Sequence, residues 1–411
     1  MTEKYFNSNC FSKYANKLLL LFALSSAISI VASQIFLGVL IAYWILFLLL
    51  KTDNENAKIE LREVYYFIIP LAFFFAVEII TSISGLSPLK SIMGVIKSSY
   101  YTLVPLAIFS SFTVSNMSVK DYLHRIESYV AALLIGQSIA GIHTIFAEGF
   151  NLDLPRLMPG PLTESGQLVL IVPLILVSVF AFFSQEVAEK EALEIKLFAK
   201  PISPVLYSAV LFIALLFLAW PGSLLFGVSE SKALLFRFLV LMLIMLITYP
   251  IIKKGTAALK EKLLSDTRVF NVNIFPLIWF CLALLFAALL INLKRGPWLG
   301  VFVEILIVGY ILSKRTVFAF VTVAFLIILT VSPARSRLIS SEEHFNINGG
   351  RKTMWELGGE LIQLYPLGLG YKNAEYMRHL DSTIPETHRH MHNNLLNITV
   401  ESGWLGLAAY C

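Results

Sequence analysis

Eleven apolar runs divide the first 332 residues of this chain, and most of them are long enough to cross a membrane. The hydrocarbon core of a bilayer requires about 20 apolar helical residues, within a range of about 17 to 25. Hydrophobic residues make up 57% of the chain and charged residues only 14%. A soluble domain of this composition would have more apolar side chains than its core could bury. The sequence therefore predicts an all-α, polytopic integral membrane protein. The runs cover residues 17–33, 35–50, 64–84, 92–114, 126–147, 165–184, 204–220, 232–251, 274–293, 298–312 and 316–332.

The chain divides into three predicted segments. Residues 1–332 hold the apolar runs and form the predicted transmembrane helical domain. Residues 333–402 are polar and are predicted to form a large helical segment outside the bilayer. Residues 403–411 begin another apolar run, but a span needs about 20 residues and only eight follow Gly403. The sequence therefore predicts eleven transmembrane helices and an incomplete twelfth.

Positive charge is distributed unevenly between the predicted loops. Counted in alternate loops, eighteen Lys or Arg residues lie on one side of the predicted spans and four on the other. Because Lys and Arg are retained on the cytoplasmic side, the amino terminus is predicted to be cytoplasmic. Residues 333–402 then face outward, into the periplasm of a Gram-negative host. The basic residues do not cluster on one face, so no nucleic-acid partner is expected. The three cysteines are isolated, so neither a disulfide framework nor a zinc site is expected.

The outer segment contains two predicted helices. Residues 351–365 have apolar side chains near helical spacing, which indicates an amphipathic helix, and Pro366 and the glycines after it end that helix. Residues 394–401 are predicted to form a short second helix, because Asn394, Asn397 and Glu401 follow a helical spacing beside apolar neighbours.

A polar stretch directly before the second helix is the strongest candidate for chemistry. Residues 388–394 contain three histidines, an arginine and two asparagines. A neutral imidazole can accept the proton of an attacking hydroxyl, so a histidine here is a candidate general base. Alternatively, the alternating His388, His390 and His392 would face one side of an extended strand and could bind a metal, although no Cys or carboxylate at ligand spacing completes that site. A third interpretation is a set of surface histidines without a chemical role.

A second candidate site lies between the ninth and tenth predicted spans, at Lys294-Arg295-Gly296-Pro297-Trp298. Proline suits the first turn of a helix, and the free N–H groups of that turn attract anions. Arg295 can bind two phosphate oxygens at once, and Gly296 lets a ligand approach the backbone. These residues fit a pyrophosphate site, although an Arg beside a Trp is also typical of an interfacial anchor.

The spacing around the histidines resembles a known family. His392-Asn393, nine further residues and then Gly403-x-x-Gly406 is similar to the pattern of the bacterial O-antigen ligases. The wider superfamily also contains O-antigen polymerases and protein O-oligosaccharyltransferases, and the chain resembles it from residue 280 or so onward. The resemblance implies that His392 is the catalytic base and that Gly403 and Gly406 are structural motif residues.

The resemblance also implies a set of substrate-binding residues. Family ligases and polymerases carry an Arg-Gly pair, here Arg295-Gly296, that is thought to hold a lipid pyrophosphate. Arg156, in a Pro-rich outer loop, is expected to be a second clamp, and Arg351 matches a pattern in the outer segment of the family. Asn393 and Glu401 are expected to complete the substrate site.

The implied reaction is transfer of O-antigen polysaccharide from undecaprenyl pyrophosphate to the lipid A-core oligosaccharide. The expected protein is an inverting glycosyltransferase of the bacterial inner membrane, with a periplasmic active site and no metal, nucleotide or other cofactor. Its expected partners are the two lipid-linked substrates and membrane lipids. The nearest alternative is an O-antigen polymerase. A lipid-linked sugar flippase is a more distant one, because it predicts inverted repeats and helices broken in mid-membrane, and neither is visible in the sequence.

Overall fold

The structure is a computed structural model of the chain. It describes residues 8–50, 61–99, 119–143, 275–291, 295–312, 345–386 and 388–411, together with short stretches of the remainder. The described elements are helices, apart from one antiparallel hairpin in which β1 (Ile195–Leu197) pairs with β2 (Lys200–Ile202). Apart from this short hairpin, the part of the chain that the structure describes is helical, which is consistent with the predicted all-α fold.

The chain forms two compact units. We call one the motif unit, because it contains the histidine-rich motif; it comprises residues 1–12, 44–115 and 338–411. The second unit comprises residues 13–43 and 116–337. The candidate pyrophosphate site at Arg295 belongs to the second unit, whereas His392 belongs to the motif unit.

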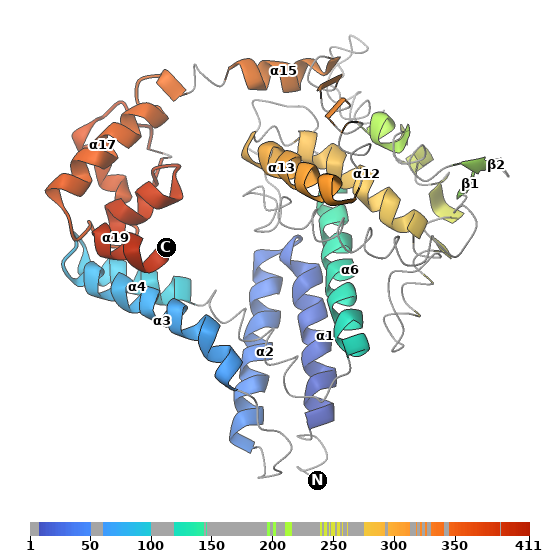
Figure 1. The fold of residues 1–411 in the computed structure, drawn as a ribbon, viewed down its shortest axis with the longest axis horizontal. Helices are drawn as coiled ribbons and strands as arrows, with labels where there is room; N and C mark the ends of the chain where they lie inside the picture. Colours follow the sequence, from blue (N-terminus) through green and yellow to red (C-terminus); the bar gives the residue numbers. More distant parts are fainter. Residues whose placement is uncertain are drawn as a thin grey trace. The chain divides into compact units, whose positions relative to one another are not determined.

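The second unit contains most of α1 (Ser8–Ser26) and α2 (Ile30–Leu50), with α6 (Val119–His143), α12 (Phe275–Ile291), α13 (Arg295–Leu312) and most of α15 (Ser332–Ile339). Helix α6 packs against α12, which crosses it (Figure 1). Gly141 allows this close approach, because a Cβ at that position would lie 3.0 Å from Cδ2 of Leu284. The indole of Trp298 donates to the carbonyl of Leu289 at 2.8 Å and so ties the start of α13 to α12.

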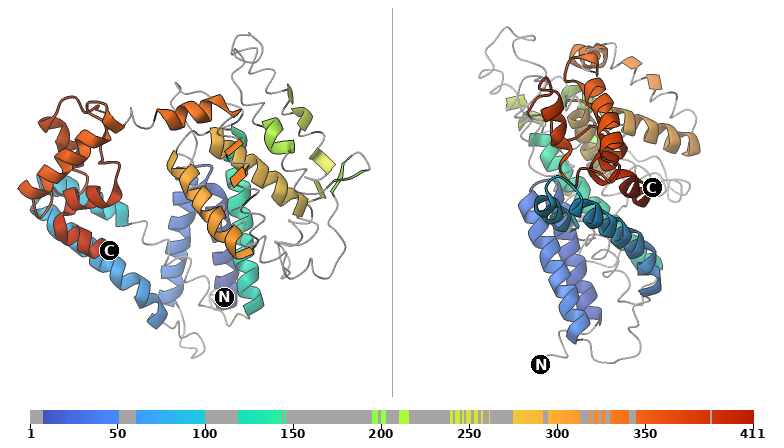
Figure 2. Two further views of the ribbon diagram at one scale, coloured as in Figure 1. Left: turned by 45° about the horizontal axis from the view of Figure 1, so that its top comes forward. Right: turned by 90° about the vertical axis from the view of Figure 1, so that its left-hand side faces the viewer.

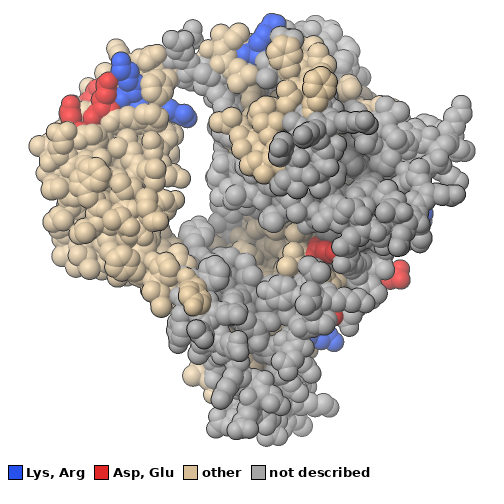
Figure 3. Space-filling view, viewed as in Figure 1, with Lys and Arg blue, Asp and Glu red and all other residues tan. Residues whose placement is uncertain are grey.

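The motif unit joins segments from opposite ends of the chain. It contains α3 (Leu61–Ile83), α4 (Pro88–Ser99), α17 (Arg351–Leu364), the 3-10 turn η5 (Ala374–Tyr376), α18 (Met377–Leu380) and α19 (Asn394–Tyr410). Helix α19 packs along α3, and the two stay side by side in both views of Figure 2. On the described surface that Figure 3 shows, the acidic and basic side chains of this unit gather at one end and the remainder is uncharged.

The core of the motif unit is formed by α17, α18, the N-terminal half of α19 and the loops between them. Its apolar side chains at helical spacing confirm the predicted amphipathic helix, which is α17. Burial of these side chains provides the main stabilisation of the unit. The buried residues are Met354, Leu361, Ile362, Leu369, Ala374, Met377, Ile384, Met391 and Val400.

The predicted spans are tested only in part. Helices α2, α3, α12 and α13 each overlap a predicted apolar run, but the break between α1 and α2 lies at residues 27–29, earlier than the run boundary near residue 34. At the end of α1, the hydroxyls of Ser25 and Ser26 donate hydrogen bonds to the carbonyls of Phe22 and Ala23. Such side-chain bonds compete with the helical pattern and favour a break there. Among the described residues, no helix combines the length and apolar character that crossing a bilayer requires. The run at residues 165–184 lies outside the described residues, and the eleven-span arrangement stays a prediction.

Candidate functional site

Helix α19 is broken at Gly403, the first glycine of the Gly-x-x-Gly pattern. Gly403 has φ 65° and ψ −169°, a left-handed conformation that glycine adopts without the steric cost of a Cβ. The loop that follows α17 occupies the break. In this loop the N–H of Leu369 donates to the carbonyl of Val400 at 2.9 Å, and the N–H of Gly370 donates to the carbonyl of Glu401 at 2.8 Å. These amides satisfy helix carbonyls that the break leaves without an intrahelical donor.

The N-terminal end of α19 is fixed by Asn393. This residue has an extended backbone, with φ −144° and ψ 115°, and its Oδ1 accepts a hydrogen bond from the N–H of Leu396 at 3.2 Å. Both features are those of a helix N-cap. His392, directly before it, has φ 53°, which is uncommon for a residue with a Cβ. The surrounding contacts must therefore hold His392 in this conformation.

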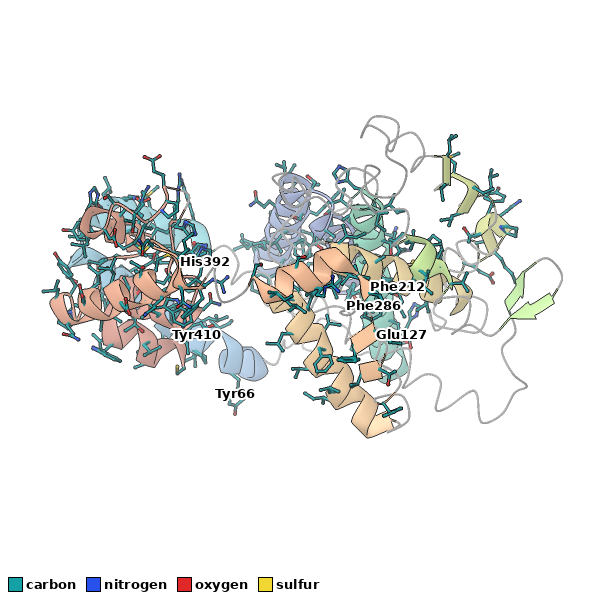
Figure 4. All side chains as sticks on the ribbon, turned by 90° about the horizontal axis from the view of Figure 1, so that it is seen from above. Tyr66, Glu127, Phe212, Phe286, His392 and Tyr410 are labelled. Atoms are coloured by element: carbon teal, nitrogen blue, oxygen red, sulfur yellow. The ribbon has the colours of Figure 1, made fainter. Side chains whose placement is uncertain are left out.

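The three histidines of the motif meet at the N-terminal end of α19, in the part of the motif unit where Figure 4 labels His392. The ring centroid of His392 lies 5.1 Å from that of His388 and 4.1 Å from that of His390. The N–H of His392 also donates to Nδ1 of His390 at 3.2 Å. Residues 388–392 do not form the extended strand that the metal-binding interpretation assumed. Among the described residues, no three His, Cys, Asp or Glu side chains are placed to hold a metal ion.

The environment of His392 favours an uncharged imidazole. Partial burial and then the neighbouring His390 and His388 lower the pKa of His392 to about 4, and the Arg351 guanidinium adds a smaller effect. Burial is also the main cause that lowers the pKa of His388. Nδ1 of His388 is buried and has no hydrogen-bond partner among the described residues. At neutral pH the ring of His392 is therefore uncharged.

Arg351 and Trp355 lie beside the histidines. Arg351 is the first residue of α17, its side chain is exposed, and its charge acts on both His388 and His392. Trp355, one turn later, donates its indole N–H to the carbonyl of Met391 at 2.9 Å. The structure thus brings Arg351, which was predicted to bind substrate, to the same site as His392.

Glu401 lies behind the histidines rather than among them. Its side chain is 5% exposed, and it accepts hydrogen bonds from the side chain of Asn397 and from the backbone N–H groups of Lys372 and Ala374. Burial outweighs these bonds and, with the nearby charge of Glu78, raises the pKa of Glu401 to about 7. Glu401 is therefore placed to orient the motif, and direct contact with a substrate is not expected while it stays buried.

Glu78 and Asn397 are two residues of this site to which the sequence analysis gave no functional role. The structure places Glu78 of α3 against Ser402 and close to Glu401 of α19. One oxygen of Glu78, Oε2, is buried without a hydrogen-bond partner among the described residues. No sequence signal could have identified this pair, because it depends on how α19 packs against a helix from the other end of the chain.

The structure does not place the remaining predicted site residues near His392. Arg295 is the first residue of α13, and Gly296 follows it in that helix. Both belong to the second unit. Arg156 lies outside the described residues. Convergence of Arg295 and Arg156 on the histidine site therefore stays a prediction.

Comparison with known families identifies the C-terminal third of the chain. A family model described as O-Antigen ligase matches residues 280–411. The match contains the histidine motif, both motif glycines, Arg351 and Arg295. No curated protein and no solved structure matches the chain. The recognition made from the spacing of His392, Asn393, Gly403 and Gly406 is therefore confirmed by the match of residues 280–411 to the O-antigen ligase family.

Proposed function

We propose that this protein is an O-antigen ligase, which transfers O-antigen polysaccharide from undecaprenyl pyrophosphate to the lipid A-core oligosaccharide. The family domain at residues 280–411 supports a ligase-type or polymerase-type activity in O-antigen and lipopolysaccharide biosynthesis. The observation that carries the proposal is the position of His392, which lies inside that domain with an uncharged ring at the capped end of α19.

In the proposed reaction, His392 takes the proton from the acceptor sugar hydroxyl. The hydroxyl oxygen forms a bond to the anomeric carbon of the donor, and the bond from that carbon to the phosphate oxygen breaks. Direct displacement of this kind inverts the anomeric centre. Undecaprenyl pyrophosphate leaves with the bonding electron pair, and no metal or other cofactor is required because pyrophosphate is a good leaving group.

A histidine with a pKa of about 4 is a weak base. Binding of the anionic substrate would raise this pKa. Three of the causes that lower this pKa are the charges of His390, His388 and Arg351, and a bound diphosphate would offset them. The pKa of His392 would then rise towards neutral pH, where a general base is most effective. Proton transfer is therefore favoured only when the anionic donor is bound.

The departing diphosphate requires positive charge. Arg351 is the cation whose charge already acts on the histidine cluster, and its planar guanidinium can bind two phosphate oxygens. We propose that the positive charges of Arg295 and Arg156 also stabilise this diphosphate. We propose further that Asn393, at the N-terminal end of α19, contacts the substrate. Preorganised charge of this type stabilises charge that develops in a transition state.

We also propose that the protein is a multi-pass protein of the bacterial inner membrane, with its amino terminus in the cytoplasm and its active site in the periplasm. Helix α3 supports this location, because large apolar side chains along one of its faces are more than half exposed. A soluble monomer rarely leaves a continuous apolar stripe uncovered, whereas lipid would cover it. The stripe consists of Tyr66, which Figure 4 labels, with Ile69, Phe73, Ile80 and Ile83.

The test is a lipopolysaccharide gel from a host strain that lacks this protein and is complemented with the wild-type chain or a variant. If the protein is a ligase, the deletion strain should contain lipid A-core without O-antigen, and the polymer should remain on the lipid carrier. The wild-type chain restores the ladder, and His392→Ala and Arg351→Ala do not. Lys352→Ala is the matched control, because Lys352 is an exposed neighbour of Arg351, and it keeps the ladder.

The same gel separates the alternatives. Core that bears a single repeat in the deletion strain would identify a polymerase. Ladders that persist in the deletion strain or in the His392→Ala strain would overturn the proposed mechanism. Membrane fractions probed for each variant confirm that a missing ladder does not result from a missing protein.

A further inference from the structure

We infer that Asn397 is a positioning residue that holds His392 in place, with Glu401 behind it. The inference rests on the proposed role of His392 as the base and extends it to residues that do not touch the substrate. Its starting point is the strained backbone of His392, whose φ of 53° must be maintained by the neighbouring residues.

The residue before His392 is fixed in three ways. The N–H of Met391 donates to Oδ1 of Asn397 at 3.1 Å, and the carbonyl of Met391 accepts from the indole N–H of Trp355 at 2.9 Å. The Met391 side chain is 0% exposed and belongs to the core of the motif unit. Both peptide groups of Met391 are therefore held, one by α19 and one by α17. Since Asn393 caps α19 directly after His392, the histidine lies between two fixed residues.

Asparagine is the side chain that fits between Met391 and Glu401. Its oxygen accepts from the Met391 backbone, and its amino group donates to the carboxyl of Glu401 one turn along α19. A side chain with an acceptor at one end and a donor at the other satisfies both partners at once. Aspartate would keep the acceptor but lose the donor, and it would place a second carboxylate against Glu401.

Glu401 is an effective anchor because it is itself immobilised. The backbone N–H groups of Lys372, just before η5, and of Ala374, its first residue, donate to the carboxyl of Glu401. On the other side, Glu78 of α3 lies nearby. The chain of contacts thus runs from the packed interface of α3 and α19, through Glu401 and Asn397, to the backbone N–H of Met391, the residue before His392.

The experiment exchanges the donor and the acceptor within this pair. Three variants are compared with the wild-type chain in detergent: Asn397→Asp, Glu401→Gln, and the double variant with both changes. In Asn397→Asp, two carboxyl groups face each other. In Glu401→Gln, the amide N–H groups of the two side chains face each other. In the double variant the Gln amide donates to the Asp carboxylate, so the hydrogen bond is restored with its direction reversed.

The pH dependence distinguishes positioning from a general loss of structure. We expect Asn397→Asp to lower kcat about tenfold at pH 8, with the acceptor KM changed by less than about twofold, because the reacting group is displaced while substrate binding remains. Relative to wild type, its activity should recover as the pH falls and Glu401 becomes protonated, because the protonated carboxyl can donate to the new carboxylate. Glu401→Gln should lose activity equally at all pH values, and the double variant should return to within about threefold of wild type. The other charged groups around the pair and the ring, namely Glu78, His388, His390 and Arg351, are the same in all variants.

A second measurement does not depend on catalysis. Hydrogen exchange of the Met391 amide, followed by mass spectrometry, should be faster than wild type in Asn397→Asp at pH 8 and should return to the wild-type rate in the double variant. Asn394→Asp is the control, because Asn394 is exposed on the first turn of the same helix, and it should change neither exchange nor kcat. A wild-type chain without ligase activity would overturn the proposed function while leaving this exchange pattern intact. Unchanged exchange in Asn397→Asp, or no rescue in the double variant, would overturn the positioning role.

Discussion

Gly368 and Gly403 pack against each other where α19 breaks, and both have a left-handed backbone, with φ 89° and 65°. A Cβ on Gly368 would lie 2.6 Å from the backbone N of Gly403, and a Cβ on Gly403 would lie 2.6 Å from the backbone C of Leu367. The two glycines therefore allow a loop and a helix to exchange backbone hydrogen bonds at close range. One of these bonds runs from the N–H of Trp404 to the carbonyl of Pro366 at 3.2 Å.

We predict that Gly403→Ala and Gly368→Ala each destabilise the protein by roughly 2 to 4 kcal/mol. Part of this cost is the left-handed backbone, and the rest is the clash with backbone atoms that cannot move aside. Thermal unfolding in detergent measures the effect. Gly359→Ala is the control, because a Cβ on Gly359 of α17 would meet nothing within 4 Å, and alanine should stabilise that helix by about 0.5 to 1 kcal/mol. Equal stability of Gly403→Ala and Gly359→Ala would contradict this account of the motif.

The cap at Asn393 gives a second prediction. Asn393→Ala removes the acceptor for the N–H of Leu396 and should destabilise the protein by about 1 kcal/mol. Asn393→Asp keeps an acceptor and adds a negative charge at the positive end of the helix, so its stability should equal that of wild type within about 0.5 kcal/mol. Chemical denaturation followed by circular dichroism compares the two variants. A cap that contributes nothing would leave both of them unchanged.

The local part of this site could be predicted from the sequence. The helical spacing of Asn394, Asn397 and Glu401 predicted the helix, and the histidines stand directly before it in the chain. Both depend on residues close together in the chain. The sequence therefore placed His392 correctly at the start of a helix that ends near Gly403.

The supporting contacts could not be predicted in the same way. Trp355 and Met391 lie 36 positions apart, and Glu78 meets Glu401 only because α3 packs against α19. Nothing in the periodicity of either helix encodes that pairing. The position of Arg295 relative to His392 belongs to the same class of long-range question, because the two residues lie in separate units.

The ion pair between Lys90 and Glu375 is predicted to contribute little. Its Nζ and Oε1 atoms lie 2.7 Å apart, and it joins α4 to η5, but the Lys90 side chain is more than half exposed. Solvent and salt screen such pairs, which typically contribute about 0 to 1 kcal/mol. Lys90→Met should therefore shift the unfolding midpoint only slightly, and less in high salt than in low salt. The hydrogen bond from Lys90 is the main cause that lowers the pKa of Glu375, so the variant should raise that pKa. A large, salt-insensitive loss of stability would show that Lys90 has another role.

Glu401 and His392 should make stability depend on pH in opposite directions. The folded-state pKa of Glu401 is raised to about 7 from 4.5, so its contribution is fully present below pH 4.5 and is lost as the pH rises through 7. The folded-state pKa of His392 is lowered to about 4 from 6.5. Because the unfolded chain binds the proton first, His392 makes the folded state less stable as the pH falls from 6.5 to 4. Between pH 4.5 and 6.5 the two residues therefore change the free energy of unfolding with pH in opposite directions.

Single substitutions separate the contributions of Glu401 and His392 to the pH dependence of stability. Relative to wild type, Glu401→Gln should gain stability as the pH rises from 4.5 to 7, by at most on the order of 3 kcal/mol. His392→Gln should gain stability in the other direction, as the pH falls from 6.5 to 4, and by less, because its ring remains partly in contact with solvent. Unfolding midpoints of both variants and of wild type, measured at pH 4, 5.5, 7 and 8 in one detergent, give these differences directly, and groups common to all three chains cancel. Differences that stay constant with pH would mean that neither side chain titrates in the environment described for it.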